Sequence, residues 1–88
     1  MTADEDPRLK RLRIRSWRRG TKEMDLILGT FADRHLAELS VPELEAFEAL
    51  LEENDPDLYR WVSGQAEAPA THADFIERLA TTPINGPD

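Results

Sequence analysis

The fold is decided by the stretch SVPELEAFEALL, residues 40–51. Ser40 and Glu43 have the spacing of a capping box, in which the serine hydroxyl accepts from the Glu43 N–H and the glutamate carboxylate accepts from the Ser40 N–H. The apolar residues that follow recur at helical spacing: Leu44, Phe47, Leu50 and Leu51. The sequence therefore predicts an amphipathic helix that begins at residue 41 and turns one apolar stripe toward a core.

Two further helices are expected upstream of this one. The first runs from Pro7, a favoured residue at a first helical position, to about Arg19, and Gly20 ends it. The second begins directly after the glycine, with Gly20 as its N-cap and Glu23 at the third position. Its apolar stripe consists of Met24, Ile27, Leu28, Phe31 and either His35 or Leu36.

Two shorter helices are predicted downstream. Asp55 is the expected N-cap of the first, Pro56 is its first residue, and Gly64 ends it. After a linker of small residues, the run Thr71-His72-Ala73-Asp74 resembles a second capping box ahead of another apolar stripe.

The predicted helices define the fold class. Helical spacing recurs along the chain and period-two alternation is almost absent, which indicates an all-α protein, a small five-helix bundle. We expect one domain over residues 1–88, with a helical core of about 7–82 and flexible termini at 1–6 and 83–88. Four aromatic side chains are expected in the core: Trp17, Phe47, Tyr59 and Trp61.

Composition excludes several classes of chemistry. The chain has no cysteine, which excludes a disulfide framework, an iron–sulfur cluster and a thiol nucleophile. The two histidines are isolated from each other in the sequence, so we expect no metal site, with His35 at a helix end and His72 on the surface. No serine has a base and an oriented acid nearby, and no glycine-rich loop could cradle a phosphate, so we expect no enzyme.

The hydropathy of the chain and the charge of its first residues indicate where in the cell the protein is expected. No run approaches the roughly 18–20 apolar residues of a membrane span, so no membrane partner is expected. Acidic residues at positions 4–6 stand where a signal peptide needs positive charge. We therefore expect a cytoplasmic protein.

Charge is divided unevenly along the chain, whose formal net charge is −7. Residues 8–22 contain no acid, and their bases are Arg8, Lys10, Arg11, Arg13, Arg15, Arg18, Arg19 and Lys22. This segment could bind nucleic acid, as in an antitoxin-like or regulatory protein, could be a solvated face paired to acidic neighbours, or could meet an acidic patch on a partner protein. The acidic remainder of the chain disfavours nucleic acid because it repels a polyanion.

The basic and acidic segments meet around Gly20. Structural roles account for the residues there: Gly20 as a helix cap, Arg19 as a cation at a helix C-terminus, and Glu23 as a capping acid. The alternative is a recognition surface, because arginine donors, a bare backbone and carboxylates on one exposed corner are common components of one. Both alternatives stay open on the residues alone.

The same junction carries a motif. Arg19-Gly20-Thr21-Lys22-Glu23 resembles the RGxxE motif of the succinate dehydrogenase assembly factor family, also called SdhE, YgfY-like or CptB-like. The resemblance continues in order through Leu50-Leu51-Glu52 and Asp55-Pro56-Asp57-Leu58-Tyr59-Arg60-Trp61, and it covers roughly residues 8–80. RGxxE alone is a weak pattern, whereas the three segments in this order are specific.

This resemblance implies a function. Members are helical assembly factors, or chaperones, that bind the flavoprotein subunit of succinate dehydrogenase, and often that of fumarate reductase. They promote covalent attachment of FAD to that client subunit (flavinylation). The chain itself would therefore hold no permanent cofactor, since the FAD belongs to the client.

Residues are carried over from the family by position. The motif residues Arg19, Gly20 and Glu23 would contact the client. Their neighbours Arg18 and Asp25 would contact the client as well.

One position departs from the family pattern. Thr21 stands where many members carry a bulky apolar residue such as methionine, so an apolar insertion into the client is not expected at this point. Trp17, immediately upstream, could supply the apolar contact instead.

Overall fold

The computed structural model describes residues 6–82, and this part of the chain is helical. Its elements are α1 (Pro7–Trp17), α2 (Lys22–His35), the short 3-10 helix η2 (Leu36–Glu38), α3 (Val41–Leu51), α4 (Asp55–Val62) and α5 (Ala73–Thr81). Residues 6–82 contain no strand, so the predicted all-α class with five α-helices is confirmed. The predicted flexible termini lie outside the described residues, except for Asp6, which caps α1 by accepting from the Arg8 N–H.

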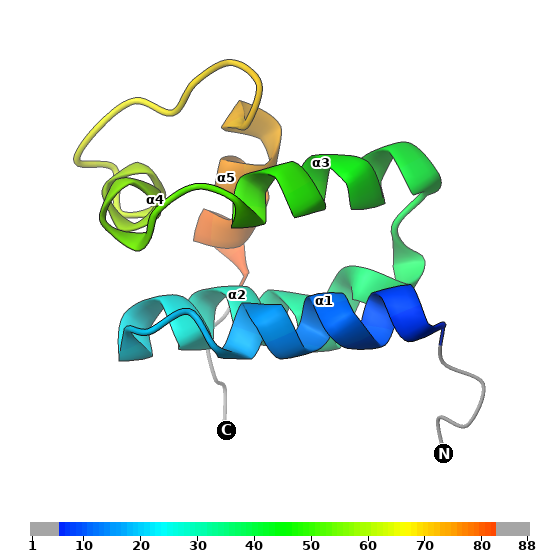
Figure 1. Cartoon of the computed structure of the whole chain (residues 1–88). Helices are drawn as coiled ribbons and strands as arrows, with labels where there is room; N and C mark the ends of the chain where they lie inside the picture. The colour runs from blue at the N-terminus through cyan, green and yellow to red at the C-terminus, as the bar shows by residue number, and fades with distance from the viewer. Residues whose placement is uncertain (1–5, 83–88) are drawn as a thin grey trace.

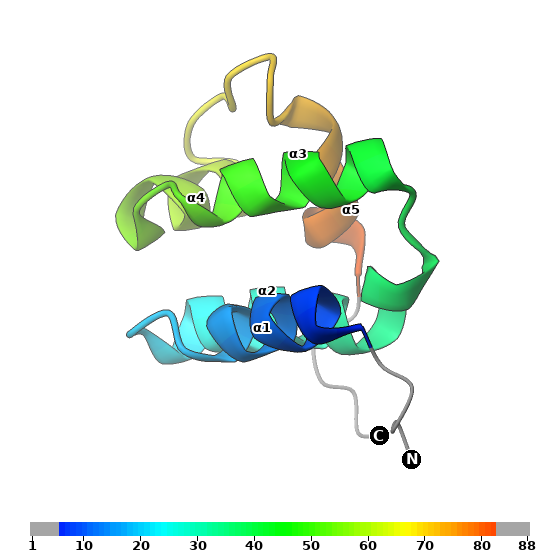
Figure 2. The same cartoon turned by 45° about the vertical axis from the view of Figure 1, so that its right-hand side comes forward.

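The helices form two layers (Figure 1). α1 and α2 run antiparallel, side by side, and make the lower layer, while α3 and α4 lie above them in both views (Figures 1 and 2). α5 descends from the upper part of the molecule and contacts both α4 and α2. A long connection of residues 63–72 joins α4 to α5.

Phenylalanines join the two layers at the centre of the core. Phe31 of α2, Phe47 of α3 and Phe75 of α5 lie with their ring centroids 5.6–5.8 Å apart. Apolar side chains around them are buried: Leu12, Met24, Ile27, Leu28, Leu36, Leu50, Leu51, Leu58, Ile76 and Leu79. The apolar stripes predicted for α2 and α3 therefore face the core, with Leu44 only partly buried.

Helix starts follow the predictions in part. The capping box of Ser40 and Glu43 is present, with both reciprocal hydrogen bonds. The N-cap of α2 is Thr21 rather than Gly20, and the N-cap of α4 is Asn54 rather than Asp55. In both cases the side chain of the actual cap accepts from a backbone N–H three residues on, at Met24 and Asp57 respectively. Each prediction was wrong by one residue because two adjacent residues were both suited to the cap.

Two other helix ends also differ. α1 ends at Trp17, earlier than the predicted Arg19, and Gly20 takes a positive φ of +105° in the turn that follows. The predicted second capping box is absent, because α5 begins after His72, whose side chain makes no cap hydrogen bond.

Three side chains lie where the sequence did not predict them. Trp17 and Tyr59 were expected in the core but are 37% and 40% exposed. His72 was expected on the surface but is buried. The other histidine, His35, ends α2 as predicted.

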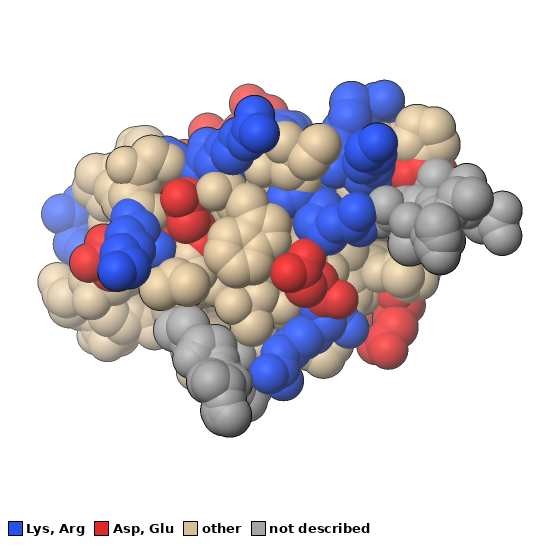
Figure 3. Space-filling model, turned by 90° about the horizontal axis from the view of Figure 1, so that it is seen from below, with Lys and Arg blue, Asp and Glu red and all other residues tan. Residues whose placement is uncertain are grey.

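The lower layer presents much of the basic segment. Seen from below, its outer surface carries Lys and Arg side chains with acidic side chains between them (Figure 3). Between residues 6 and 82, no helix has the length and apolarity needed to cross a membrane.

Candidate functional site

The turn between α1 and α2 forms an exposed corner, and Gly20 and Thr21 shape it. Gly20 has a φ in the region that favours glycine, and a Cβ placed there would find open space. The next residue, Thr21, starts α2 by accepting from the Met24 N–H. The corner is therefore a bare stretch of backbone followed directly by a helix N-terminus.

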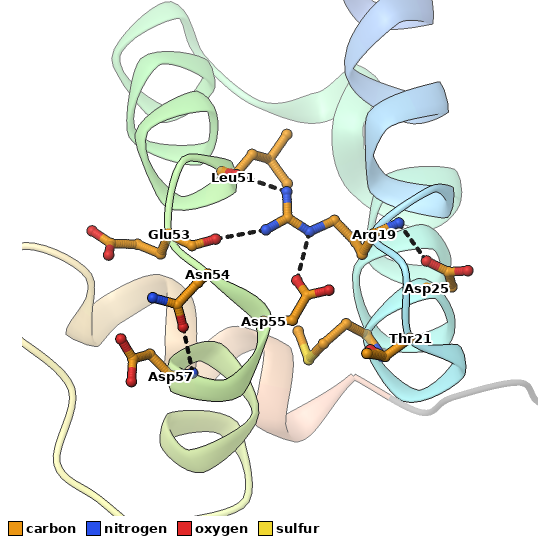
Figure 4. Close-up of polar contacts among 9 residues, drawn as sticks. Arg19, Thr21, Asp25, Leu51, Glu53, Asn54, Asp55 and Asp57 are labelled. Carbon is orange, nitrogen blue, oxygen red and sulfur yellow. Dashed lines mark hydrogen bonds and ion pairs between the residues drawn. The ribbon is translucent and has the colours of Figure 1, made fainter.

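Arg19 points inward from this corner (Figure 4). Its Nε donates to Oδ1 of Asp55 at 2.9 Å, and its two terminal nitrogens donate to the backbone oxygens of Leu51 at 2.7 Å and Glu53 at 2.6 Å. Its own backbone N–H donates to the carboxylate of Asp25. Its side chain is only 12% exposed.

These contacts fasten the corner to the turn between α3 and α4. Leu51 is the last residue of α3, whose terminal carbonyls have no partner within the helix. Asp55 is the first residue of α4, where a carboxylate is favoured by the helix dipole. The planar guanidinium can satisfy both helix ends at once, and it sets the position of the corner relative to α4.

A groove of about 280 Å³ lies where the corner meets α4. Its lining residues are Thr21 and Glu23 from the start of α2, and Asp55, Pro56 and Tyr59 from α4. The carboxylate of Glu23 is exposed and has no hydrogen bond or ion pair to any residue of 6–82, whereas the carboxylate of Asp55 already pairs with Arg19. The groove thus offers one unpaired carboxylate beside an exposed tyrosine ring.

Of the six residues predicted to contact the client, some lie at the exposed corner and others contact the protein's own atoms. Gly20 and Glu23 lie at the exposed corner, and Arg18 is exposed beside them. Arg19 and Asp25 face the protein's own atoms. Trp17 does not line the groove and packs instead against Gly29 of α2.

Three residues of the groove were not predicted as site residues. Asp55, Pro56 and Tyr59 complete the groove, and all three belong to the third family-like segment, residues 55–61. That segment was available as a signal, because two motifs of one family often build one surface. Nothing in the spacing of residues 19 and 55 indicated that their side chains meet.

The basic segment is partly paired with acids of other helices. Arg8 donates to both carboxylate oxygens of Glu48 at 2.8 and 2.9 Å, and Arg15 lies 3.0 Å from Glu52. The hydrogen bond from Arg8 holds the pKa of Glu48 below its ordinary value. Among the described residues no hydrogen bond or ion pair reaches the side chains of Lys10, Arg11, Arg18, Lys22 or Arg34. The predicted pairing with acidic neighbours therefore accounts for only part of this charge.

Metal ligation has no candidate in the described part of the chain. Residues 6–82 contain no group of three His, Cys, Asp or Glu side chains placed to hold an ion.

Comparison with known proteins gives matches over most of the chain. The family model Sdh5, described as flavinator of succinate dehydrogenase, matches residues 10–83. The chain is 36% identical over 81 residues to the FAD assembly factor SdhE of Aliivibrio fischeri, a match that covers 89% of this chain and 87% of that protein.

Mitochondrial proteins are similar as well. The chain is 41% identical over 64 residues to succinate dehydrogenase assembly factor 2 of Aspergillus terreus, covering 73% of this chain and 22% of that protein. It is 38% identical over 70 residues to the protein of the same name from Dictyostelium discoideum, covering 80% and 50% respectively. The chain thus spans half or less of the mitochondrial relatives. Because the family match covers residues 10–83 and includes the whole corner, the chain belongs to the Sdh5 family, the flavinators of succinate dehydrogenase.

Proposed function

We propose that this chain is an assembly factor that binds the flavoprotein subunit of succinate dehydrogenase and promotes covalent attachment of FAD to it. The relatives named for succinate dehydrogenase and FAD assembly support this function. The proposal extends to the flavoprotein subunit of fumarate reductase as a second client. It places the protein in the cytoplasm, with the Aliivibrio relative as support.

The observation that carries the proposal is that the exposed carboxylate of Glu23 has no partner among residues 6–82. A carboxylate that serves the fold normally has a partner, and Asp25 and Asp55 both have one in Arg19. Glu23 lines the groove together with Asp55, and its carboxylate makes no such contact with residues 6–82. Its place in the motif is therefore better explained by a group on the client than by the fold.

Arg19 acts in this proposal as a positioning residue. Its donors are already engaged with Asp55 and with the α3–α4 turn, so it holds Gly20 and Glu23 in place instead of pairing with a client carboxylate. Gly20 then lets client backbone approach the corner closely, because it has no side chain. A fixed corner loses little conformational freedom on binding, which favours affinity.

The chain acts in this scheme without catalytic residues and without a bound flavin of its own. The groove of about 280 Å³ is smaller than the roughly 300–1,000 Å³ of sites that enclose drug-sized ligands. FAD is larger than such ligands, so the residues present do not fit it as a resident cofactor. The flavin chemistry would take place within the client, and this protein would hold the client in the arrangement that permits it.

Flavinylation in cells lacking the natural factor tests the proposal. The flavoprotein subunit is expressed alone, with the wild-type chain, with Glu23→Gln, and with the control Glu77→Gln, which changes an exposed carboxylate on α5. In-gel flavin fluorescence should be strong with the wild-type chain and the control, and at least about tenfold weaker with Glu23→Gln. Equal flavin on the client with and without the wild-type chain would reject the proposed function.

The same assay addresses the finer parts of the proposal. Repeating it with the fumarate reductase subunit tests the second client, and cell fractionation tests the cytoplasmic location. The purified chain should bring no flavin absorbance with it, and stoichiometric FAD on the chain would overturn the absence of a resident cofactor.

A further inference from the structure

Trp17 is held in a fixed orientation on the outer side of the α1–α2 layer. Its ring lies against the backbone of Gly29, and a Cβ at position 29 would overlap ring atoms Cδ2, Cε2 and Cε3. Its indole N–H faces the carboxylate of Asp33, with Nε1 3.3 Å from each oxygen. Only a glycine at position 29 allows the ring to pack in this position. More than a third of the tryptophan nevertheless stays exposed.

Helical spacing places other exposed groups around this ring. Ile14 lies one turn before Trp17 on α1 and is 42% exposed. Spacings of three and four residues place three cations beside Ile14, and no hydrogen bond or ion pair joins their side chains to a residue of 6–82. We call this set the Trp17 face: Lys10, Arg11, Ile14, Trp17 and Arg18.

The remaining arginines of α1 are paired. Arg8 and Arg15 reach toward α3 and pair with Glu48 and Glu52, and Nε of Arg13 lies 3.8 Å from the carboxylate of Asp33 on α2. The cations of α1 and its C-cap whose side chains have no such partner in residues 6–82 are therefore the ones next to Ile14 in the helical spacing. Figure 3 shows the outer surface of this layer, where basic side chains, with acidic ones between them, lie around uncharged ones.

This composition is that of a protein interface. Tryptophan and arginine are the residues most enriched among those that dominate binding energy, and they act best when an apolar centre is surrounded by a polar rim. Because Gly29 and Asp33 already fix the Trp17 ring, this side chain loses little conformational entropy when a partner covers it. Free cations at the rim select a partner of negative charge.

We propose that the Trp17 face is a second docking surface for the client flavoprotein, separate from the groove at Glu23. It would take an acidic, amphipathic segment whose apolar side chain covers Trp17 and Ile14 and whose carboxylates pair with Arg11 and Arg18. The inference rests on the proposed function for the identity of the client. Protein is favoured over nucleic acid because the formal net charge of the chain is −7, which repels a long polyanion more strongly than a short acidic segment.

Calorimetric binding of the purified flavoprotein subunit to the full chain tests this surface. Trp17→Ala should weaken binding by about 30-fold, as expected for a dominant interface residue. Gly29→Ala changes no residue of the Trp17 face but displaces the Trp17 ring, because the added Cβ would overlap it. This variant should therefore also weaken binding, by at least about fivefold. Trp17→Phe, which fits the same seat, should lie between the wild-type chain and Trp17→Ala.

Charge is tested by a matched pair of variants. The double variant Arg11→Gln with Arg18→Gln should weaken binding and reduce its dependence on salt concentration. Arg15→Gln, which removes an exposed cation of the same helix that pairs with Glu52, should leave both unchanged. Circular dichroism and the emission of Trp61 check that each variant is folded.

The outcomes separate this inference from the proposed function. If the wild-type chain does not bind the flavoprotein, both fail. If Glu23→Gln weakens binding while the Trp17 and arginine variants do not, only the second surface is rejected. If the wild-type chain binds a mixed-sequence RNA or DNA oligonucleotide at physiological salt and the arginine double variant does not, the occupant is nucleic acid and the inference is overturned.

Discussion

Nε of Arg19 lies 2.9 Å from Oδ1 of Asp55, and the two side chains are only 12% and 11% exposed. Arg19 belongs to the RGxxE motif, and Asp55, 36 residues further along the chain, is the first residue of the third family-like segment. The ion pair joins these two motifs into one structural unit. A single site, made of the α1–α2 corner and the start of α4, therefore explains why both segments are present.

Removal of the Arg19 side chain should be strongly destabilising. Arg19→Ala leaves the nearly buried carboxylate of Asp55 without its partner and the carbonyls of Leu51 and Glu53 without their donors. Breaking one side of such a pair costs about 3 kcal/mol in the free energy of unfolding. Urea denaturation followed by circular dichroism measures this loss.

A neighbouring arginine provides the control for that prediction. Arg18 is exposed and makes no contact of this kind within residues 6–82, so Arg18→Ala should change the free energy of unfolding by less than about 0.5 kcal/mol. Arg19→Lys should fall between the two, because an ammonium cannot reach three acceptors in the geometry of a guanidinium. Equal stability of Arg19→Ala and Arg18→Ala would show that the observed contacts do not hold the turn.

Glu23→Ala should leave the protein nearly as stable as the wild type. Glu23 is the second residue of α2, where its charge has a favourable interaction with the helix dipole of about 0.5 kcal/mol. It makes no hydrogen bond to Gly20, because Thr21 is the cap. Urea denaturation should therefore show a loss of at most about 0.5 kcal/mol, and a loss above about 1.5 kcal/mol would restore the capping role for Glu23.

The core was predictable from the sequence because its signal is local. Residues three and four apart on one helix share a face, so the apolar stripes of α2, α3 and α5 could be read directly. The capping box at Ser40 is equally local, since all its partners lie within four residues. These features do not depend on how the helices pack against one another.

The site was less predictable because its contacts are long-range. The sequence indicated that residues 18–25 matter, but not that Arg19 turns inward to meet Asp55. It also placed Trp17 and Tyr59 in the core, although a domain of 88 residues has too little interior to bury every aromatic ring. The seat of Trp17 depends on Gly29 in the neighbouring helix, and a glycine inside a helix was the one signal that could have indicated it.

Acid should destabilise the protein partly through Glu48. The hydrogen bond from Arg8 lowers the pKa of this carboxyl below the ordinary 4.5, so the native state binds a proton there less readily than the unfolded chain. This contribution to stability is fully present above about pH 4.5 and is lost as the pH falls through the lower native pKa. The free energy of unfolding, measured in urea from about pH 7 to about pH 3, should decrease over the acidic part of that range.

Two variants isolate the contribution of Glu48. Glu48→Gln has no carboxyl to titrate, so its free energy of unfolding should decrease less steeply below about pH 4.5 than that of the wild type. Glu77→Gln, which changes an exposed side chain on α5, should keep the wild-type slope. Identical slopes for Glu48→Gln and the wild type would mean that the pair with Arg8 adds nothing to stability.

His72 should hold the long connection of residues 63–72 against the rest of the protein. Its Nε2 lies 3.0 Å from the Glu53 carboxylate, and its ring centroid is 5.9 Å from that of Trp61. Because this side chain is buried, His72→Ala should cost about 2 kcal/mol and speed amide hydrogen exchange in residues 63–72 more than in α1. His35→Ala, the control, removes a more exposed imidazole 3.7 Å from Glu38 and should cost less than about 1 kcal/mol.

The backbone of Glu53 also accepts from Arg19, so the effects of His72→Ala and Arg19→Lys on the free energy of unfolding should not be additive. Strict additivity would show that the two contacts act independently.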